Sequence, residues 1–79
     1  MNRFYSRTSI SYLKRLDRKT RSRIVAAIDN LPQVGDIIKM RAKKIENLYR
    51  LRIGKFRILF IRQTDYLKIL EIDTRGDIY

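Results

Sequence analysis

The chain has 79 residues, 44% of them hydrophobic, and a formal net charge of +11 from 19 Lys and Arg against 8 Asp and Glu. This length and apolar fraction predict a single small folded domain over residues 1–79, with little apolar side chain left for a deep ligand pocket. The sequence has no cysteine and no histidine, which excludes disulfides, thiol nucleophiles, Cys/His zinc sites and imidazole acid–base chemistry. We therefore expect neither a metal nor a cofactor.

The excess of positive charge indicates a polyanionic partner, because a net charge of this size repels itself. Nucleic acid is the first candidate and an acidic protein the second, while a merely solvated basic surface is the remaining interpretation. No apolar run approaches the ~20 residues that span a bilayer, and no signal-peptide pattern opens the chain. These observations predict a cytoplasmic protein without a membrane contact.

The N-terminal part is predicted to form one strand and two helices. Asn2–Ser6 is short and aromatic, as in an edge or first strand. A first amphipathic helix is expected over Ser9–Leu16 with Thr8 or Ser9 as its N-cap, and its apolar positions are Ile10, Leu13 and Leu16. Asp17 is expected to cap a second helix over Arg18–Leu31, whose apolar face consists of Ile24, Ala27, Ile28 and Leu31.

Strands dominate the remainder of the sequence. Pro32 disfavours the helical conformation at Leu31, and Gly35 with Asp36 marks a turn. A short strand is expected over Ile37–Met40 and a basic loop over Arg41–Asn47, after which every segment is strand-like. The predicted fold is therefore α+β, with a helical hairpin on one face of a small, mainly antiparallel twisted sheet of about four strands.

The segment NLYRLRIGKFRILFI, residues 47–61, predicts a β-hairpin. Glycine at the first central position suits a two-residue type II′ turn at Gly54–Lys55, which pairs Ile53 with Phe56 and thereby fixes the register. Alternation then places six apolar or aromatic residues on one face: Tyr49, Leu51, Ile53, Phe56, Ile58 and Phe60. We expect the two helices to pack on that face.

Three arginines share the other face of the predicted hairpin. Arg50 and Arg52 come from one strand, and Arg57 lies opposite Arg52 on the next. Like charges directly across a strand pair are destabilising, so a purely solvated face would more readily mix both signs. Arginine presents a planar fork that matches phosphate oxygens, and we therefore interpret this face as a site for a phosphate backbone.

A last strand is expected over Leu67–Asp73. If Gln63 pairs with Leu67, Leu70 and Ile72 join the core, whereas Glu71 and Asp73 fall on the cationic face with Asp73 opposite Arg57. A carboxylate at this position could orient an arginine or accept a proton.

The helical hairpin, the segment YRLRIGKFRILF and the closing IDTRGDIY together resemble the RelE/ParE superfamily of type II toxin–antitoxin toxins, in the expected order over nearly the whole chain. The resemblance implies a toxin held inactive in a hetero-oligomeric complex by a cognate antitoxin, which we expect to be acidic. Its RelE branch consists of ribosome-dependent endoribonucleases that cleave messenger RNA, whereas its ParE branch inhibits DNA gyrase. We favour the RelE branch; the alternatives are a ParE-like gyrase inhibitor and a non-catalytic basic RNA-binding module.

The resemblance also implies a set of site residues. The positions that match the family's catalytic residues are Arg50, Arg52, Arg57, Arg75 and Tyr79, and further RNA contacts are expected from Lys43, Lys44 and Lys55. The implied reaction is attack of a ribose 2′-hydroxyl on the adjacent phosphate. Lysine is common at the two strand positions that carry Arg50 and Arg52 here, and arginine is a poor base, so the general base stays open between Tyr79, Glu71, Asp73 and no dedicated group.

Overall fold

The structure, a computed structural model, describes residues 1–41 and 44–74 and contains two helices and a five-stranded sheet within them. In chain order the elements are β1 (Asn2–Tyr5), α1 (Arg7–Lys14), α2 (Arg18–Asp29), β2 (Asp36–Lys39), β3 (Leu48–Ile53), β4 (Phe56–Arg62) and β5 (Tyr66–Asp73). The prediction of about four strands is therefore one short.

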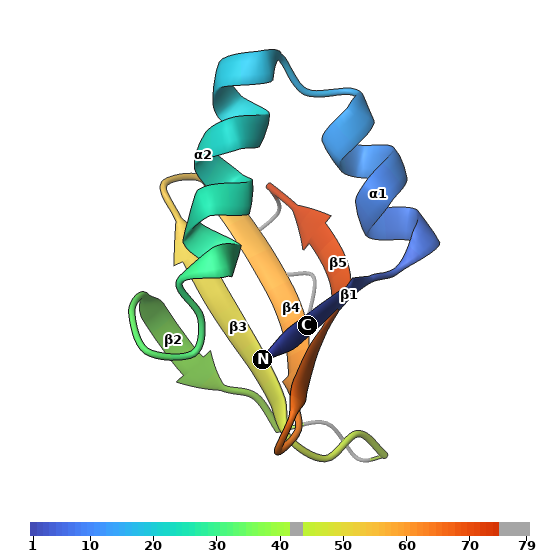
Figure 1. Cartoon of the computed structure of the whole chain (residues 1–79), viewed down its shortest axis with the longest axis vertical. Helices are drawn as coiled ribbons and strands as arrows, with labels where there is room; N and C mark the ends of the chain where they lie inside the picture. The colour runs from blue at the N-terminus through green and yellow to red at the C-terminus, as the bar shows by residue number, and fades with distance from the viewer. Residues whose placement is uncertain (42–43, 75–79) are drawn as a thin grey trace.

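The strand order across the sheet is β1-β5-β4-β3-β2, with β1 parallel to β5 and the other neighbours antiparallel. Both helices cover the same face of the sheet, with α1 beside β5 and α2 across β3 and β4 (Figure 1). The predicted α+β class and the one-sided helical hairpin are confirmed. Neither helix has the length and hydropathy that crossing a membrane requires, as far as the described residues go.

The core lies between the helices and this face. The helices contribute Leu13, Ile24 and Ile28, joined by Leu31 just beyond α2, and the sheet contributes Leu51, Phe56, Ile58, Phe60, Leu67, Ile69 and Ile72. The apolar face predicted for the second helix is confirmed, as is that of the hairpin, where Tyr49 and Ile53 pack at the margin of the cluster.

Helix α1 begins two residues earlier than its sequence suggests. Its N-cap is Ser6, whose hydroxyl oxygen accepts a hydrogen bond from the Ser9 N–H at 3.1 Å and donates one to the Leu70 carbonyl at 2.7 Å. The expectation of Thr8 or Ser9 as the cap is therefore wrong. In this helix Ser9 is fully buried, and Ile10, which was predicted to belong to the apolar face, is 42% exposed.

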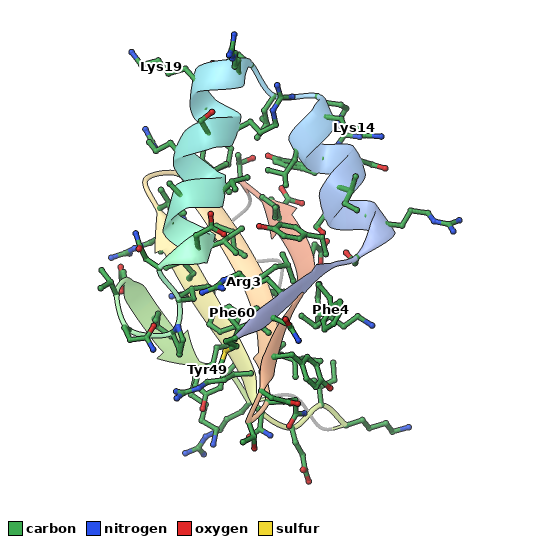
Figure 2. All side chains as sticks on the ribbon, viewed as in Figure 1. Arg3, Phe4, Lys14, Lys19, Tyr49 and Phe60 are labelled. Carbon is green, nitrogen blue, oxygen red and sulfur yellow. The ribbon has the colours of Figure 1, made fainter. Side chains whose placement is uncertain are left out.

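Helix α2 has the predicted N-cap, Asp17, whose carboxylate accepts from the Thr20 N–H at 3.1 Å. The helix ends at Asp29, two residues before the predicted end at Leu31. Its last carbonyls point to Arg3 of β1: the guanidinium donates from Nε to the Ile28 carbonyl (3.1 Å) and from Nη2 to those of Asp29 and Leu31 (both 2.7 Å). Arg3 lies below the end of α2 in Figure 2, so a strand residue completes a helix terminus.

Strand β5 contains an irregularity that the sequence does not reveal. Arg57 pairs with Asp73 and Leu59 with Glu71, but the register shifts by one between Leu59 and Phe60, which pairs with Ile69. Leu70 is the extra residue of this bulge, and alternation on β5 reverses there. The prediction that Leu70 joins the core is therefore wrong: Ile72 does so, together with Leu67 and Ile69.

Replacing Arg3 tests the tie between β1 and the end of α2. Arg3→Leu keeps an apolar stem but leaves partly buried carbonyls without a donor, so we expect the free energy of unfolding to fall by about 2 kcal/mol. Arg3→Lys restores the charge without the planar fork and should recover only part of this loss. Denaturant titration measures both, with the exposed Arg62→Leu as control; equal effects of Arg3→Leu and Arg62→Leu would contradict the capping role.

The N-cap of α2 predicts an acid dependence of stability. Hydrogen bonds from the side chain and backbone of Thr20 lower the pKa of Asp17 from its ordinary value of 3.8. The folded pKa lies below the unfolded one, so this stabilisation is complete above the unfolded pKa and is lost as the pH falls through the folded pKa. Asparagine caps without titrating, so the stability difference between wild type and Asp17→Asn should stay constant from neutral pH down to about 5 and then change.

Denaturant titrations of the wild type and Asp17→Asn over this pH range measure the difference. If the stability difference between wild type and Asp17→Asn stays constant through the acid range, the charge of the Asp17 carboxylate contributes nothing to the stability of the fold.

Candidate functional site

The hairpin of β3 and β4 has the predicted register. Ile53 pairs with Phe56, Arg52 with Arg57 and Tyr49 with Phe60, and Gly54 has a φ of 55°, a backbone conformation that favours glycine. Successive side chains of these strands consequently point to opposite faces. One face meets the helices, and the other forms the candidate site.

Three arginines lie together on the face away from the helices. Arg50 and Arg52 alternate on β3, and Arg57 is the direct cross-strand neighbour of Arg52. The flanking positions are apolar, since Arg50 lies between Ile38 of β2 and the fully buried Leu59 of β4. We call Arg50, Arg52 and Arg57 the arginine face.

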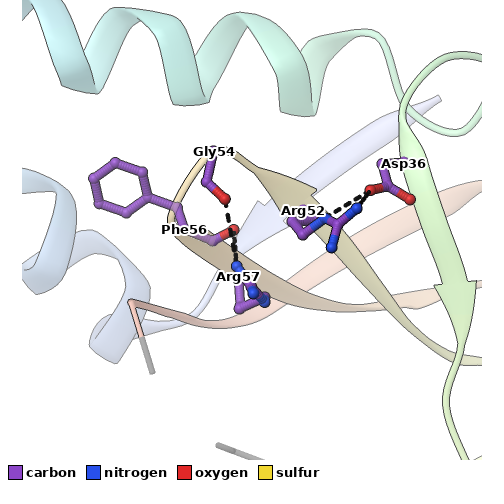
Figure 3. A network of polar contacts seen from close by, with 5 residues as sticks. All are labelled: Asp36, Arg52, Gly54, Phe56 and Arg57. Carbon is purple, nitrogen blue, oxygen red and sulfur yellow. Dashed lines mark hydrogen bonds and ion pairs between the residues drawn. The ribbon is translucent and has the colours of Figure 1, made fainter. Parts of the chain in front are cut away.

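Asp36, the first residue of β2, binds one member of the arginine face. Its Oδ2 accepts from Arg52 Nε at 2.8 Å and lies 2.7 Å from Nη2, as Figure 3 shows. Both side chains are about half exposed, at 52% for Arg52 and 47% for Asp36, so the pair orients Arg52 more than it stabilises the fold. The sequence suggested only a turn residue at Asp36, because nothing local indicates that β2 pairs with β3 in this register.

Arg50 and Arg57 are held differently. Arg57 turns toward the β3–β4 turn, with Nη1 3.5 Å from the carbonyl oxygens of Gly54 and Phe56 (Figure 3). The Nε atoms of Arg50 and Arg57 are shielded from solvent and have no hydrogen-bond partner among the described residues. Buried donors without partners are uncommon in folded proteins, and two of them on a cationic face are suited to an anionic oxygen.

Two carboxylates share this face with the arginines. Asp73 pairs with Arg57 as predicted, and Glu71 pairs with Leu59. Asp73 is half-buried, and its Oδ1 accepts from the Thr74 N–H. The geometry thus places acceptors for a proton beside permanently charged donors.

Of the remaining predicted site residues, only Lys44 and Lys55 belong to the part of the chain that the structure describes. Arg75, Tyr79 and Lys43 lie outside the described residues. Lys55 is exposed in the β3–β4 turn, with Nζ 5.6 Å from the centroid of the Phe56 ring, next to the arginine face. Lys44 precedes β3 and therefore lies at the opposite end of that strand from Lys55, so the structure does not bring these two lysines together.

The described residues contain no group of three His, Cys, Asp or Glu side chains that could hold a metal ion. The chemistry available on the arginine face is electrostatic. Guanidinium groups stay charged at all physiological pH values and bind phosphate oxygens through two parallel hydrogen bonds. The arrangement can therefore bind and orient a phosphodiester and stabilise additional negative charge on it.

Comparisons with known proteins agree with this architecture. No protein-family model matches the chain, and no curated protein matches it either. Among solved structures, the RelB–RelE antitoxin–toxin complex from Methanococcus jannaschii matches with a TM-score of 0.71 and 26% identity, over 96% of this chain and 94% of that one.

Two further structures match at lower identity. The archaeal RelE–RelB complex from Pyrococcus horikoshii OT3 has a TM-score of 0.76 at 23% identity, covering 96% of both chains. The RelBE2 complex from Mycobacterium tuberculosis has a TM-score of 0.73 at 19% identity, covering 96% of this chain and 92% of that one. The chain has a RelE-like toxin fold, as the resemblance of its sequence implies.

The arginine face predicts a gain in stability when it is dismantled. Arg52 and Arg57 are opposed across a strand pair, and Asp73 on the other side of Arg57 offsets part of their repulsion. Arg57→Gln, which keeps most of the side chain, should therefore raise the free energy of unfolding by only some tenths of a kcal/mol at low salt. Added salt screens the repulsion and should shrink the gain.

The matched control is Arg62→Gln, because Arg62 is exposed on β4 opposite Leu67. Denaturant titration at two ionic strengths measures both variants. If Arg57→Gln instead lowers the free energy of unfolding by the same amount at both ionic strengths, repulsion among the arginines does not destabilise the fold and the prediction is wrong.

Proposed function

We propose that this protein is the toxin of a type II toxin–antitoxin module and cleaves messenger RNA on the ribosome. The observation that carries the proposal is the arginine face on a RelE-like fold, with three guanidinium groups on one side of the sheet and the helices on the other. Like charges across a strand pair are unfavourable for folding, whereas a phosphodiester is bound well by such a group of donors.

The proposed reaction is an intramolecular transesterification. The ribose 2′-oxygen attacks the adjacent phosphorus while its proton leaves; the bond from phosphorus to the 5′-oxygen breaks, and that oxygen gains a proton. The products are a 2′,3′-cyclic phosphate and a 5′-hydroxyl end. Charge grows on the phosphate oxygens in the transition state, where donors already in place are most effective. We assign this role to Arg50, Arg52 and Arg57, with Arg75 as a further donor by resemblance.

Proton transfer is assigned to groups other than the arginines. Glu71 and Asp73 lie on the same face as Arg57 and could accept the 2′-hydroxyl proton, and Tyr79 is the third candidate by resemblance. Asp73 lies directly opposite Arg57, a position that suits orientation of the arginine. Lys43, Lys44 and Lys55 are proposed as contacts to RNA beyond the cleaved bond.

The proposed partner is a cognate acidic antitoxin. The three solved structures described above are each a complex of a toxin with an antitoxin, and the net charge of +11 favours an acidic partner for this chain. We therefore propose a hetero-oligomeric toxin–antitoxin complex as the resting form.

Removing two donors tests the cleavage. Arg50→Gln with Arg57→Gln should lower the rate of message cleavage by roughly a hundredfold or more, because each position supplies charge to the transition state. Primer extension on ribosome-bound message measures the rate, and Arg62→Gln is the control, since Arg62 lies on the other side of β4 and should leave cleavage unchanged. Intact message with wild-type protein, or cleavage that survives the double substitution, would contradict the proposal.

The ParE-like alternative, inhibition of DNA gyrase, is tested with the same purified protein. A gyrase supercoiling reaction with excess toxin should proceed normally if the protein is an endoribonuclease. Trapped double-strand breaks in DNA together with intact message would assign the protein to gyrase inhibition instead.

A further inference from the structure

Cations converge on the β3–β4 turn from both sides of the sheet. On the side of the arginine face, Arg57 Nη1 lies 3.5 Å from the Gly54 carbonyl oxygen. On the helix side, Arg23 of α2 reaches the same residue, because a Cβ built on Gly54 would lie 3.0 Å from Arg23 Nη2. Lys55 is exposed at the tip of the turn. Two guanidinium groups and an ammonium group thus surround one glycine turn.

The basic surface continues along α2 away from the turn. Lys19 precedes Arg23 by four residues, so both lie on the same side of the helix, and both are exposed. Figure 2 shows Lys19 projecting outward near the start of α2. Cations near a helix N-terminus oppose the helix dipole, and like charges four residues apart repel. Within residues 1–41 and 44–74, neither Arg23 nor Lys55 lies in an ion pair.

We propose that Lys19, Arg23 and Lys55 form a track for the phosphodiester backbone of RNA, which passes over the β3–β4 turn from α2 to the arginine face. This inference rests on the proposed function and extends its substrate contact to the helix side of the sheet. The track runs from α2 to the β3–β4 turn and ends beside Arg57, which belongs to the candidate site. Binding of the flanking phosphates along the track would position the cleaved bond at the arginine face.

The surroundings of the track favour a nucleic-acid backbone over an acidic protein. Protein interfaces depend on apolar or aromatic anchors in their centre. The exposed large apolar residues of the described chain are Met1, Phe4, Ile10, Val34 and Ile38, and none belongs to α2 or to the β3–β4 turn. A row of cations without such anchors matches a chain of regularly spaced phosphates.

Salt dependence of RNA binding tests the track without requiring catalysis. The probe is a 2′-O-methyl RNA of roughly 12 nucleotides, within the range that single-strand sites cover, which cannot undergo the 2′-hydroxyl attack. Each phosphate contact contributes about 0.7 to the slope of log affinity against log salt for a single strand. Lys19→Gln with Arg23→Gln should therefore reduce the magnitude of that slope by about 1.4, and Lys19→Arg with Arg23→Lys should leave it unchanged.

The matched control is Lys14→Gln with Arg62→Gln, which removes the same charge at positions away from the track. Both residues are exposed, and Lys14 lies on the side of the molecule away from the turn in Figure 2. The control should keep the wild-type slope. Equal slopes in the two double variants would overturn the track. If both slopes are reduced, RNA binding depends on net charge alone, and if neither is reduced, RNA does not contact Lys19 and Arg23.

Two further outcomes are decisive. If the track variant keeps the RNA slope but loses a co-purifying antitoxin, the surface belongs to the protein partner and the proposal fails. If wild-type protein binds the probe with the predicted difference between variants but never cleaves message, the endoribonuclease function fails while the track stands. Circular dichroism on each variant establishes that the fold is intact.

Discussion

The position of the β3–β4 turn at Gly54 is the constraint on which the rest of the structure depends. A shift of the hairpin register by one residue would exchange the two faces of a strand, burying arginines under the helices and exposing the core. The φ of 55° at Gly54 favours glycine, and a Cβ added there would lie 3.0 Å from Nη2 of Arg23. One turn therefore fixes the core, the arginine face and the approach of α2 to the sheet.

The helices are joined to this sheet through polar contacts as well as the core. Arg3 of β1 donates to three carbonyls at the end of α2, and Ser6 caps α1 while its hydroxyl donates to the Leu70 carbonyl at the bulge of β5. In a domain of 79 residues the core alone contributes little net stability. These hydrogen bonds add to the core on the helix side of the sheet, whereas the other side carries the arginine face.

Local rules account for what the sequence predicted correctly. The Asp17 cap, the apolar spacing of α2 and the pairing of Arg52 with Arg57 depend on residues close in sequence. The predicted pairing of Asp73 with Arg57 is observed, but the expected pairing of Gln63 with Leu67 is wrong: Leu67 pairs with Arg62, and the bulge at Leu70 restores the register. Contacts between distant segments were missed. The bulge at Leu70 lies in the pairing of β5 with β4, and the contact of Asp36 with Arg52 depends on how β2 meets β3; no local pattern records either of them.

The sheet carries arginine instead of lysine, and this choice bears on which residues of the proposed site could transfer a proton. A guanidinium keeps its charge across the physiological range and is a poor base, so Arg50, Arg52 and Arg57 present a constant charge to phosphate. We therefore expect a change of pH in that range to affect the proposed cleavage only through the RNA or a different side chain. Glu71 and Asp73 lie on the same face as the arginines, so in the proposed reaction charge stabilisation and proton transfer would belong to different residues of neighbouring strands.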